Sequence, residues 1–184
     1  MSRLRIFEET QPAHPILGTN AHAEISDTLA LLGVRFERWK ANAVLPPDAS
    51  QDTVIAAYRS DIERLKAQGG YQAVDVISLN PDHPEREALR RKFLNEHTHG
   101  EDEVRFFVAG SGLFTLHVDQ RVYEVLCHTG DLISVPANTP HWFDMGPQPY
   151  FVAIRLFTNP AGWVANFTGN AIAERFPRYE ANAA

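Results

Sequence analysis

Thiols are scarce in this sequence, which has one cysteine among 184 residues. A lone cysteine cannot close a disulfide within the chain, and it excludes a zinc site built mainly from thiolates. Eight histidines stand against that single thiol. If the chain holds a metal ion, imidazole is therefore the expected ligand. Cys127 ends the apolar run VYEVL, and we interpret it as a buried hydrophobe at a strand end, without chemistry of its own.

Long apolar runs and basic tracts are also missing. There is no stretch of about 18 consecutive apolar residues, and the first residues lack the apolar segment of a secretory signal, so we expect a cytoplasmic protein. The net charge is −6, from 17 basic and 23 acidic residues, which argues against nucleic acid or a membrane surface as partner. Glycine (11) and proline (12) are too few for a low-complexity chain. The composition, 44% apolar, suits one globular domain with a sizeable core.

The pattern of apolar residues divides the chain into three parts. Residues 1–90 mix the two kinds of secondary structure, with strands expected at 4–9, 34–40 and 74–79 and helices at 26–32, 53–68 and 84–94. Residues 91–160 hold about six β-rich runs without helices between them, which indicates an antiparallel sandwich or barrel. Residues 161–184 suggest an irregular or helical wrap. We find no linker and predict a single, mainly β domain over residues 1–184.

The residues able to carry chemistry concentrate in the stretch HTHGEDE at 97–103. Side chains two apart in a strand share a face, so His97 and His99 point into one space. If the next strand starts near Asp102, then Glu103 and Arg105 share a face, and Glu103 can meet both imidazoles. Two imidazoles and a carboxylate suit Fe(II), Ni(II), Mn(II) or Zn(II) better than calcium or Cu(I). Taken alone, the stretch has a less favoured alternative reading as a solvated loop that happens to hold two histidines.

A second segment adds a third histidine. GDLISVPANTPH at 130–141 places His141 after a strand and a proline-bounded turn, and an aromatic pair follows it. By itself His141 could be a core histidine. Together the two segments predict three imidazoles and one carboxylate, and four protein ligands on a six-coordinate ion leave two positions for a chelating substrate.

These segments resemble the two metal-binding motifs of the cupin superfamily. The matching residues are His97, His99, Glu103 and Gly110 in the first motif and Gly130, Pro136 and His141 in the second. The sequence departs from the motifs at Asn138, where the superfamily usually has glycine, and at Met145, where it often has asparagine. It also lacks the leading glycine of the first motif. The resemblance implies a cupin double-stranded β-helix, a jelly-roll barrel with flanking α-helices.

Three stretches narrow the resemblance: FLNEHTHGEDEVRFFVAGSGLFTLHV, GDLISVPANTPHWFDMG and AIRLFTNPAGWVANFTG. They resemble the acireductone dioxygenase family of methionine salvage, densely over residues 90–170 and loosely before them. The resemblance implies one Fe(II) or Ni(II) per monomer and cleavage of 1,2-dihydroxy-3-keto-5-methylthiopentene by O2. With iron the family gives formate and 4-methylthio-2-oxobutanoate. With nickel it gives formate, carbon monoxide and 3-methylthiopropanoate.

Further residues are candidates around such a site. Arg105 is the expected catalytic residue, because a fixed cation favours the anionic form of the substrate, and because an arginine in a core strand is costly unless it is paired or lies at a site. The alternative is a surface arginine in an exposed strand. Arg155 either binds substrate oxygens or pairs with a carboxylate. The candidates for the pocket wall, which aromatic core packing explains equally well, are Phe107, Phe143 and Trp163. The resemblance gives Glu96 a part in metal loading and Asp102 a part in relaying structural change; hydrogen bonding around the ligands is the alternative.

The sequence therefore predicts a monomeric, metal-dependent dioxygenase of this family, acting on a small molecule and O2. Two alternatives stay open: another metal-dependent cupin dioxygenase or isomerase with the same ligands, and a non-catalytic cupin that uses the metal structurally or as a sensor. Open positions on the metal weigh against a structural site, which is usually closed. Iron and nickel fit the same ligands, so the metal stays open as well. The remaining histidines are expected on the surface: His14, His22, His83, His117 and His128.

Overall fold

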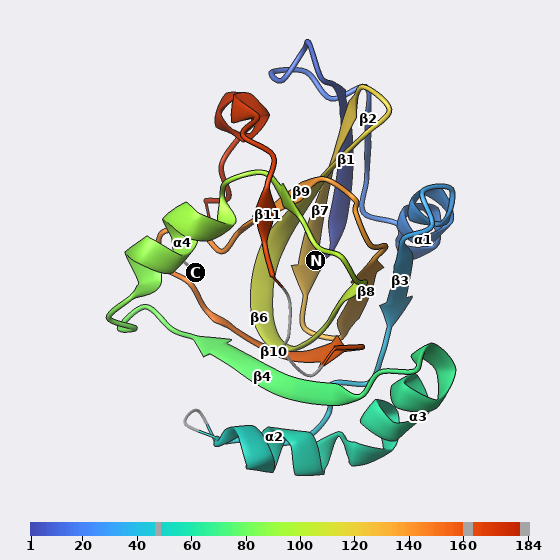
Figure 1. Cartoon of the computed structure of the whole chain (residues 1–184), viewed down its shortest axis with the longest axis vertical. Helices are drawn as coiled ribbons and strands as arrows, with labels where there is room; N and C mark the ends of the chain where they lie inside the picture. Colours follow the sequence, from blue (N-terminus) through green and yellow to red (C-terminus); the bar gives the residue numbers. More distant parts are fainter. Residues whose placement is uncertain (47–48, 160–163, 181–184) are drawn as a thin grey trace.

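Strands dominate the computed structural model, which describes residues 1–46, 49–159 and 164–180 (Figure 1). The strands are β1 (Arg3–Glu8), β2 (Leu17–Thr19), β3 (Arg35–Arg38), β4 (Ala73–Leu79), β5 (His97–Thr98), β6 (Glu103–Val118), β7 (Arg121–His128), β8 (Asp131–Val135), β9 (His141–Asp144), β10 (Phe151–Phe157) and β11 (Asn166–Phe167). The helices are α1 (His22–Ala30), α2 (Gln51–Ala57), α3 (Arg59–Gly69), α4 (Arg86–Phe93) and the 3-10 helix η1 (Ala171–Arg175). None of the helices in these ranges is long and apolar enough to span a membrane.

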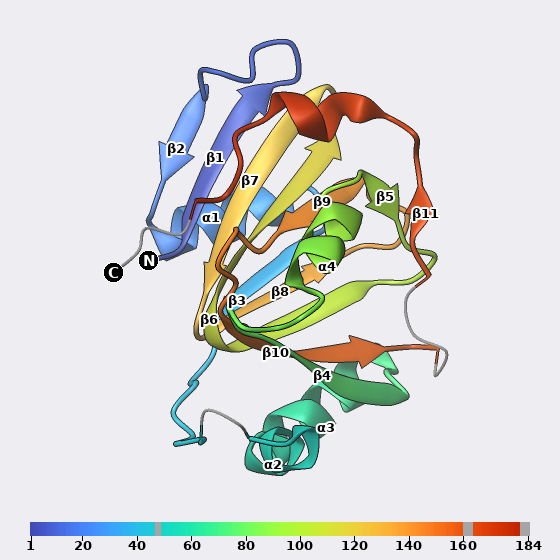
Figure 2. The same ribbon diagram turned by 90° about the vertical axis from the view of Figure 1, so that its left-hand side faces the viewer.

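The strands form two antiparallel sheets that share β6. One sheet has the order β4-β10-β6-β8-β3, and the other has the order β11-β5-β9-β6-β7-β1-β2. The first half of β6 pairs with β8 and β10, and its second half pairs with β7 and β9. The sheets wrap around a common interior, while α2 and α3 lie outside against the sheet that contains β4 (Figure 2).

Gly110 is the point at which β6 passes from one sheet to the other. Gly110 lies opposite Phe151 of β10, and the next residue, Ser111, lies opposite His128 of β7. The backbone of Gly110 has a φ of +73°, and a Cβ built there would meet the carbonyl oxygen of Tyr150. Only glycine fits this close approach. Two of the six β-rich runs expected over residues 91–160, VRFFVAG and GLFTLHV, are therefore the two halves of one bent strand.

The alternation of side chains along β6 separates the interior from the helix-covered face. Val104 and Phe106 pack outward against α2 and α3. Phe107 faces the interior, where the largest apolar cluster gathers side chains from β1, β7, β8 and β9. Cys127 is fully buried in that cluster, as expected for a strand-end hydrophobe. Glu103 and Arg105 have the same parity as Phe107, so they too point inward.

The helix expected at 53–68 is two helices, and this prediction was wrong about continuity. Ser50 caps α2 by accepting a hydrogen bond from the Thr53 backbone N–H. The helix then breaks at Tyr58, whose φ and ψ of −111° and 20° are not helical. Tyr58 buries its ring edge-on against Phe106, with centroids 5.3 Å apart. Tertiary packing, which apolar periodicity does not report, thus interrupts the helix.

Two further differences lie near the amino terminus. The helix expected to start at Ser26 or Asp27 begins at His22, and the Ser26 hydroxyl donates to the carbonyl of Phe36 instead of capping the helix. The short strand β2 was not predicted, because its residues are largely exposed and carry no alternating pattern.

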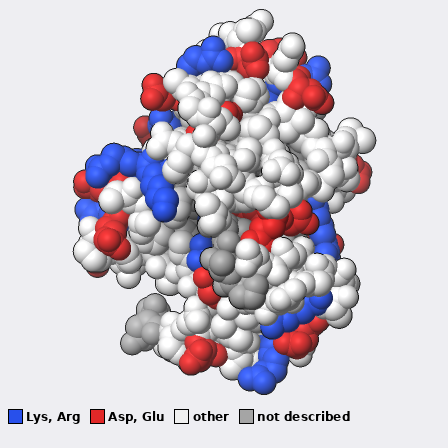
Figure 3. Space-filling view, in the orientation of Figure 1, with Lys and Arg blue, Asp and Glu red and all other residues white. Residues whose placement is uncertain are grey.

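On the face drawn in Figure 3, acidic and basic side chains lie interspersed in small groups.

Candidate metal centre

Four buried side chains converge where β5, β6 and β9 lie together. His97 of β5 and His141, the first residue of β9, lie directly opposite each other. Glu103 is the first residue of β6, and His99 follows β5 by one residue. Each of the four side chains offers a ligand atom, and these atoms all lie within 4.8 Å of one another. The structure thus brings together the four residues that the sequence motifs single out.

The backbone fixes the orientation of all three imidazoles. The Nδ1 atoms of His97, His99 and His141 donate to backbone carbonyls at 2.7, 3.0 and 2.8 Å; the acceptors are Asn95, Val164 and Thr139. An imidazole that donates from Nδ1 keeps its Nε2 lone pair for a cation or a proton. This is the arrangement in which histidines ligate metals.

The short distances between the Glu103 carboxylate and two imidazoles require a proton or a metal ion between them. Its Oε2 lies 2.8 Å from His141 Nε2 and 3.1 Å from His99 Nε2. A lone pair and a carboxylate oxygen repel at such distances unless a proton or a metal ion lies between them. Adjacent ligands of an octahedral ion with bonds of about 2.1 Å are about 3.0 Å apart. The spacing and the donor set therefore fit a divalent transition metal.

The charges in the site favour the metal-binding forms of two of the four residues, His97 and Glu103. Burial, and next the neighbouring His141, lower the pKa of His97 to about 4, so His97 is neutral near pH 7. Burial acts to raise the pKa of Glu103, but Arg105 and His141 hold it well below its usual range. Burial acts to lower the pKa of His99, but the hydrogen bond to Glu103 raises it overall. A neutral imidazole and an ionised carboxylate are the ligand forms that a metal requires.

Arg105 lies beside the carboxylate on the same face of β6. Its Nε is 2.7 Å from Glu103 Oε1, and its side chain is only 5% exposed. The guanidinium also lies over the rings of Phe143 and Phe114, with its carbon 4.7 and 5.2 Å from the ring centroids. Pairing and cation–π contact offset the cost of burying this charge. Arg105 is therefore a paired, buried arginine and not a surface residue.

A cavity of about 420 Å³ opens next to the four residues. Its polar lining residues are Asp75, Lys92, His97, His99, Arg105 and Arg155, and its apolar ones are Ile77, Leu89, Phe93, Phe157, Ala165 and Phe167. Arg155 binds Asp75 through two hydrogen bonds, at 2.8 and 2.6 Å. Arg155 thus pairs with a carboxylate and also lines the cavity, so both roles considered for it remain compatible with its position.

Two of the three aromatic residues proposed for the pocket wall, Phe107 and Phe143, lie elsewhere. Both side chains are fully buried in the core. Neither is among the described residues that line the cavity. Phe143 instead packs its ring against the guanidinium of Arg105. Trp163 lies outside the described residues. The aromatic lining comes from Phe93, Phe157 and Phe167, and the parity of Phe157, two residues beyond Arg155 in β10, is the signal that could have indicated one of them.

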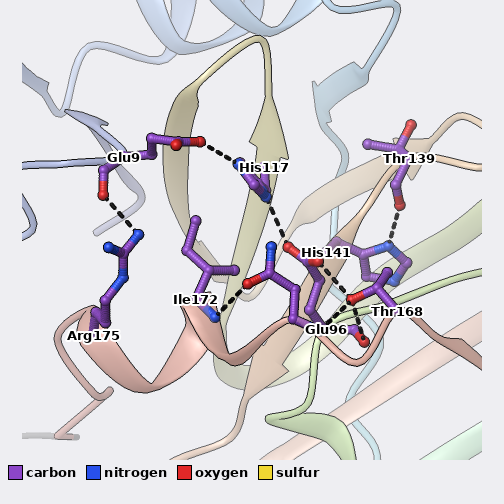
Figure 4. A network of polar contacts seen from close by, with 9 residues as sticks. Glu9, Glu96, His117, Thr139, His141, Thr168, Ile172 and Arg175 are labelled. Carbon is purple, nitrogen blue, oxygen red and sulfur yellow. Dashed lines mark hydrogen bonds and ion pairs between the residues drawn. The ribbon is translucent and has the colours of Figure 1, made fainter.

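The carboxylates of Glu96 and Asp102 form hydrogen bonds with residues outside the group of four. Asp102 accepts from the backbone N–H of Ala137, in the turn that leads to His141. Glu96 binds His117 through one carboxylate oxygen and Thr168 through the other (Figure 4). His117 is therefore not a surface histidine, and that prediction was wrong: its side chain is 17% exposed and lies between two carboxylates. The signal was its place in the strand GLFTLHV, which is not a loop.

Comparison with known proteins agrees with this geometry. The model of the ARD/ARD' family matches residues 3–165. An acireductone dioxygenase from Pseudomonas aeruginosa is 61% identical over 180 residues, which cover 98% of this chain and 99% of that protein. One from Alcanivorax borkumensis is 60% identical over 177 residues, covering 96% and 98%.

A solved structure extends the comparison to the fold. The acireductone dioxygenase from Bacillus anthracis with a cadmium ion in its active centre is 33% identical and superposes with a TM-score of 0.80, covering 91% of this chain and 98% of that one. This match, together with the two sheets that share β6, confirms the predicted mainly β, single-domain cupin fold. The chain belongs to the ARD/ARD' family of acireductone dioxygenases.

Proposed function

We propose that this chain is an acireductone dioxygenase whose single divalent metal ion is held by His97, His99, Glu103 and His141. One observation carries the proposal: three oriented imidazoles and one carboxylate converge beside a cavity that a buried arginine also lines. Three nitrogens and one oxygen leave room for both oxygens of an enediol on a six-coordinate ion. The relatives named above, one of them with a metal ion in its active centre, support the same function.

Fe(II) or Ni(II) at this site would supply a Lewis acid and a template for the reaction of an enediol with O2. We infer that both ions are accepted, because each suits nitrogen and carboxylate ligands. The ion that the protein takes up would then decide the products. Formate and 4-methylthio-2-oxobutanoate are expected with iron, and formate, carbon monoxide and 3-methylthiopropanoate with nickel.

Arg105 is proposed to hold the substrate in its anionic form. An enediol must lose protons to become electron-rich enough to react with O2, and a fixed positive charge in a site of low dielectric favours that loss. Arg105 meets this need, because it is buried, lines the cavity and is held over two aromatic rings. Its pairing with Glu103 keeps the guanidinium in one orientation.

The apolar side of the cavity is proposed to take the methylthio tail. Leu89 and Phe93 lie one turn apart on α4, and Ile77 of β4 and Phe157 of β10 line the same cavity. Apolar contact with these side chains orients a substrate whose other end is the enediol, and it keeps water from the reacting atoms.

The cytoplasmic location and the monomeric state, both expected from the sequence, remain predictions.

Substrate selectivity tests this proposal against another cupin dioxygenase with the same ligands. Oxygen uptake and formate release are measured with acireductone, with other enediols and with thiols, at equal protein and metal concentration and against a protein-free control. Uptake specific for acireductone is expected. Faster uptake with another substrate would favour the alternative enzyme, and metal binding without uptake on any substrate would favour a sensor.

A further inference from the structure

His117 lies in the second half of β6 and contacts two acidic residues far from it in sequence (Figure 4). Its Nδ1 is 2.8 Å from Glu96 Oε2, and its Nε2 is 2.9 Å from Glu9 Oε2. The imidazole of His117 thus bridges Glu9 and the buried Glu96, and it holds both carboxylates beside the second half of β6.

His117 also hydrogen-bonds with the two residues that directly precede the proposed ligands His97 and His141. The side chain of His117 fixes Glu96, which directly precedes His97. The backbone N–H of His117 donates to the carbonyl of Pro140 at 2.9 Å, and Pro140 directly precedes His141. The neighbouring Leu116 lies opposite His141 in the β6–β9 pair. One residue of a long, well-paired strand thus spans the starts of two ligand-bearing strands.

The strand that carries His97 needs such support, because β5 has only two residues. Glu96 anchors it through both carboxylate oxygens: Oε2 binds His117, and Oε1 accepts from the Thr168 hydroxyl at 2.7 Å. The Thr168 backbone N–H also donates to the Glu96 carbonyl. The carbonyl that accepts from His97 Nδ1 belongs to Asn95, the residue before Glu96. Any shift of Glu96 therefore moves the group that orients the His97 imidazole.

We propose that His117 is a positioning residue for the metal centre. It sets the separation and orientation of the His97 and His141 imidazoles by holding the residue before each, and its side chain acts through Glu96. The inference rests on the proposed metal site and is independent of the substrate. Partners of this kind, one step removed from the ligands, typically change metal affinity by about 10- to 100-fold when they are lost.

The test is a double-mutant cycle on metal affinity, measured by competition of Ni(II) between the full chain and a chelator. H117Q and E96Q are each expected to weaken Ni(II) binding by roughly 10- to 100-fold. Because both changes break one link, the double variant is expected to bind about as weakly as either single variant. The ligand-field absorption of the Co(II)-loaded protein is expected to shift in the same variants, because the imidazoles reorient.

Two controls separate positioning from general stability. Leu29→Ala removes a fully buried side chain of α1, away from the four converging residues, and is expected to lower the thermal midpoint while leaving Ni(II) affinity within about twofold. Thr168→Val removes the hydrogen bond to the other oxygen of Glu96 and serves as the second variant if H117Q does not fold, with a measurable loss of Ni(II) affinity of up to about 10-fold expected, at the low end of the usual range.

Unchanged Ni(II) affinity and Co(II) absorption in H117Q would overturn the proposal, and so would losses in H117Q and E96Q that simply multiply in the double variant. Failure of the unsubstituted chain to bind Ni(II) would overturn the metal centre itself. Tight Ni(II) binding without oxygen uptake on acireductone would contradict only the proposed function.

Discussion

Glu103 divides its two carboxylate oxygens between the imidazoles and Arg105. Oε2 lies 2.8 Å from His141 Nε2, while Oε1 lies 2.7 Å from Arg105 Nε. The proposed metal ligand is therefore oriented by a cation that also lines the cavity. Lysine cannot copy this arrangement, because its compact ammonium has neither the planar fork nor the ring stacking of a guanidinium.

Replacement of Arg105 is expected to separate metal binding from turnover. Arg105→Ala should retain the metal, since the four ligand side chains stay, but should lower kcat by roughly 100-fold as the fixed charge is lost. Arg105→Lys should recover only a small part of the rate. Metal analysis and oxygen uptake on the same samples check this, with Arg121→Ala, an exposed arginine of β7, as the control. Turnover that survived in Arg105→Ala would refute the role of the charge.

Loss of a proposed ligand imidazole is expected to abolish metal binding, which Arg105→Ala retains. His97→Ala and His141→Ala should each abolish tight metal binding, because two imidazoles and one carboxylate hold a divalent ion far less tightly than the full set. His14→Ala, which removes an exposed imidazole, should bind metal like the unsubstituted chain. Elemental analysis after gel filtration measures this. Full metal content in His97→Ala would exclude that residue from the ligand set.

The grouping of the four proposed ligands was predictable from strand parity together with the resemblance to the cupin motifs. Parity places His97 and His99 on one face, and the resemblance, rather than any local rule, indicated that Glu103 and His141 join them. Asn138, which departs from the glycine of the motif, still adopts a φ of +63°, a conformation that asparagine tolerates better than most residues. The substitution therefore preserves the turn.

Features that depend on contacts between distant residues were not predictable. The cavity wall is assembled from α4, β4, β10 and β11, so Phe93 and Phe157 line it while Phe107 does not. His117 hydrogen-bonds with Glu9 and Glu96, neither of which lies near it in sequence. Such long-range pairings leave no local pattern to detect.

The bend of β6 provides a test of the fold. Gly110→Ala is expected to destabilise the protein by at least ~2 kcal/mol, because the position has positive φ and a Cβ would collide with the Tyr150 carbonyl. Gly18→Ala, at an exposed site with nothing within 4 Å of a new Cβ, is the matched control and should change stability by no more than ~0.5 kcal/mol. Urea unfolding measures both. Equal stability of the two variants would contradict the bend at Gly110.

Cys127 is expected to be unreactive in the folded protein. It is fully buried, and burial raises the pKa of its thiol well above the ordinary value. The reactive thiolate is then not formed at neutral or mildly alkaline pH. Titration with a thiol reagent at pH 8 should find no accessible thiol in the native chain and one after denaturation. Rapid native labelling would show that the cluster around Cys127 opens.

The dependence of activity on the metal tests the central claim most directly. The protein is stripped by a chelator, checked for an intact fold by circular dichroism, and then reloaded anaerobically with Fe(II) or Ni(II). The stripped protein should be folded and inactive. One metal ion per chain should restore oxygen uptake on acireductone, with formate from both forms and carbon monoxide from the nickel form alone. Full activity of the folded, metal-free protein would contradict the account.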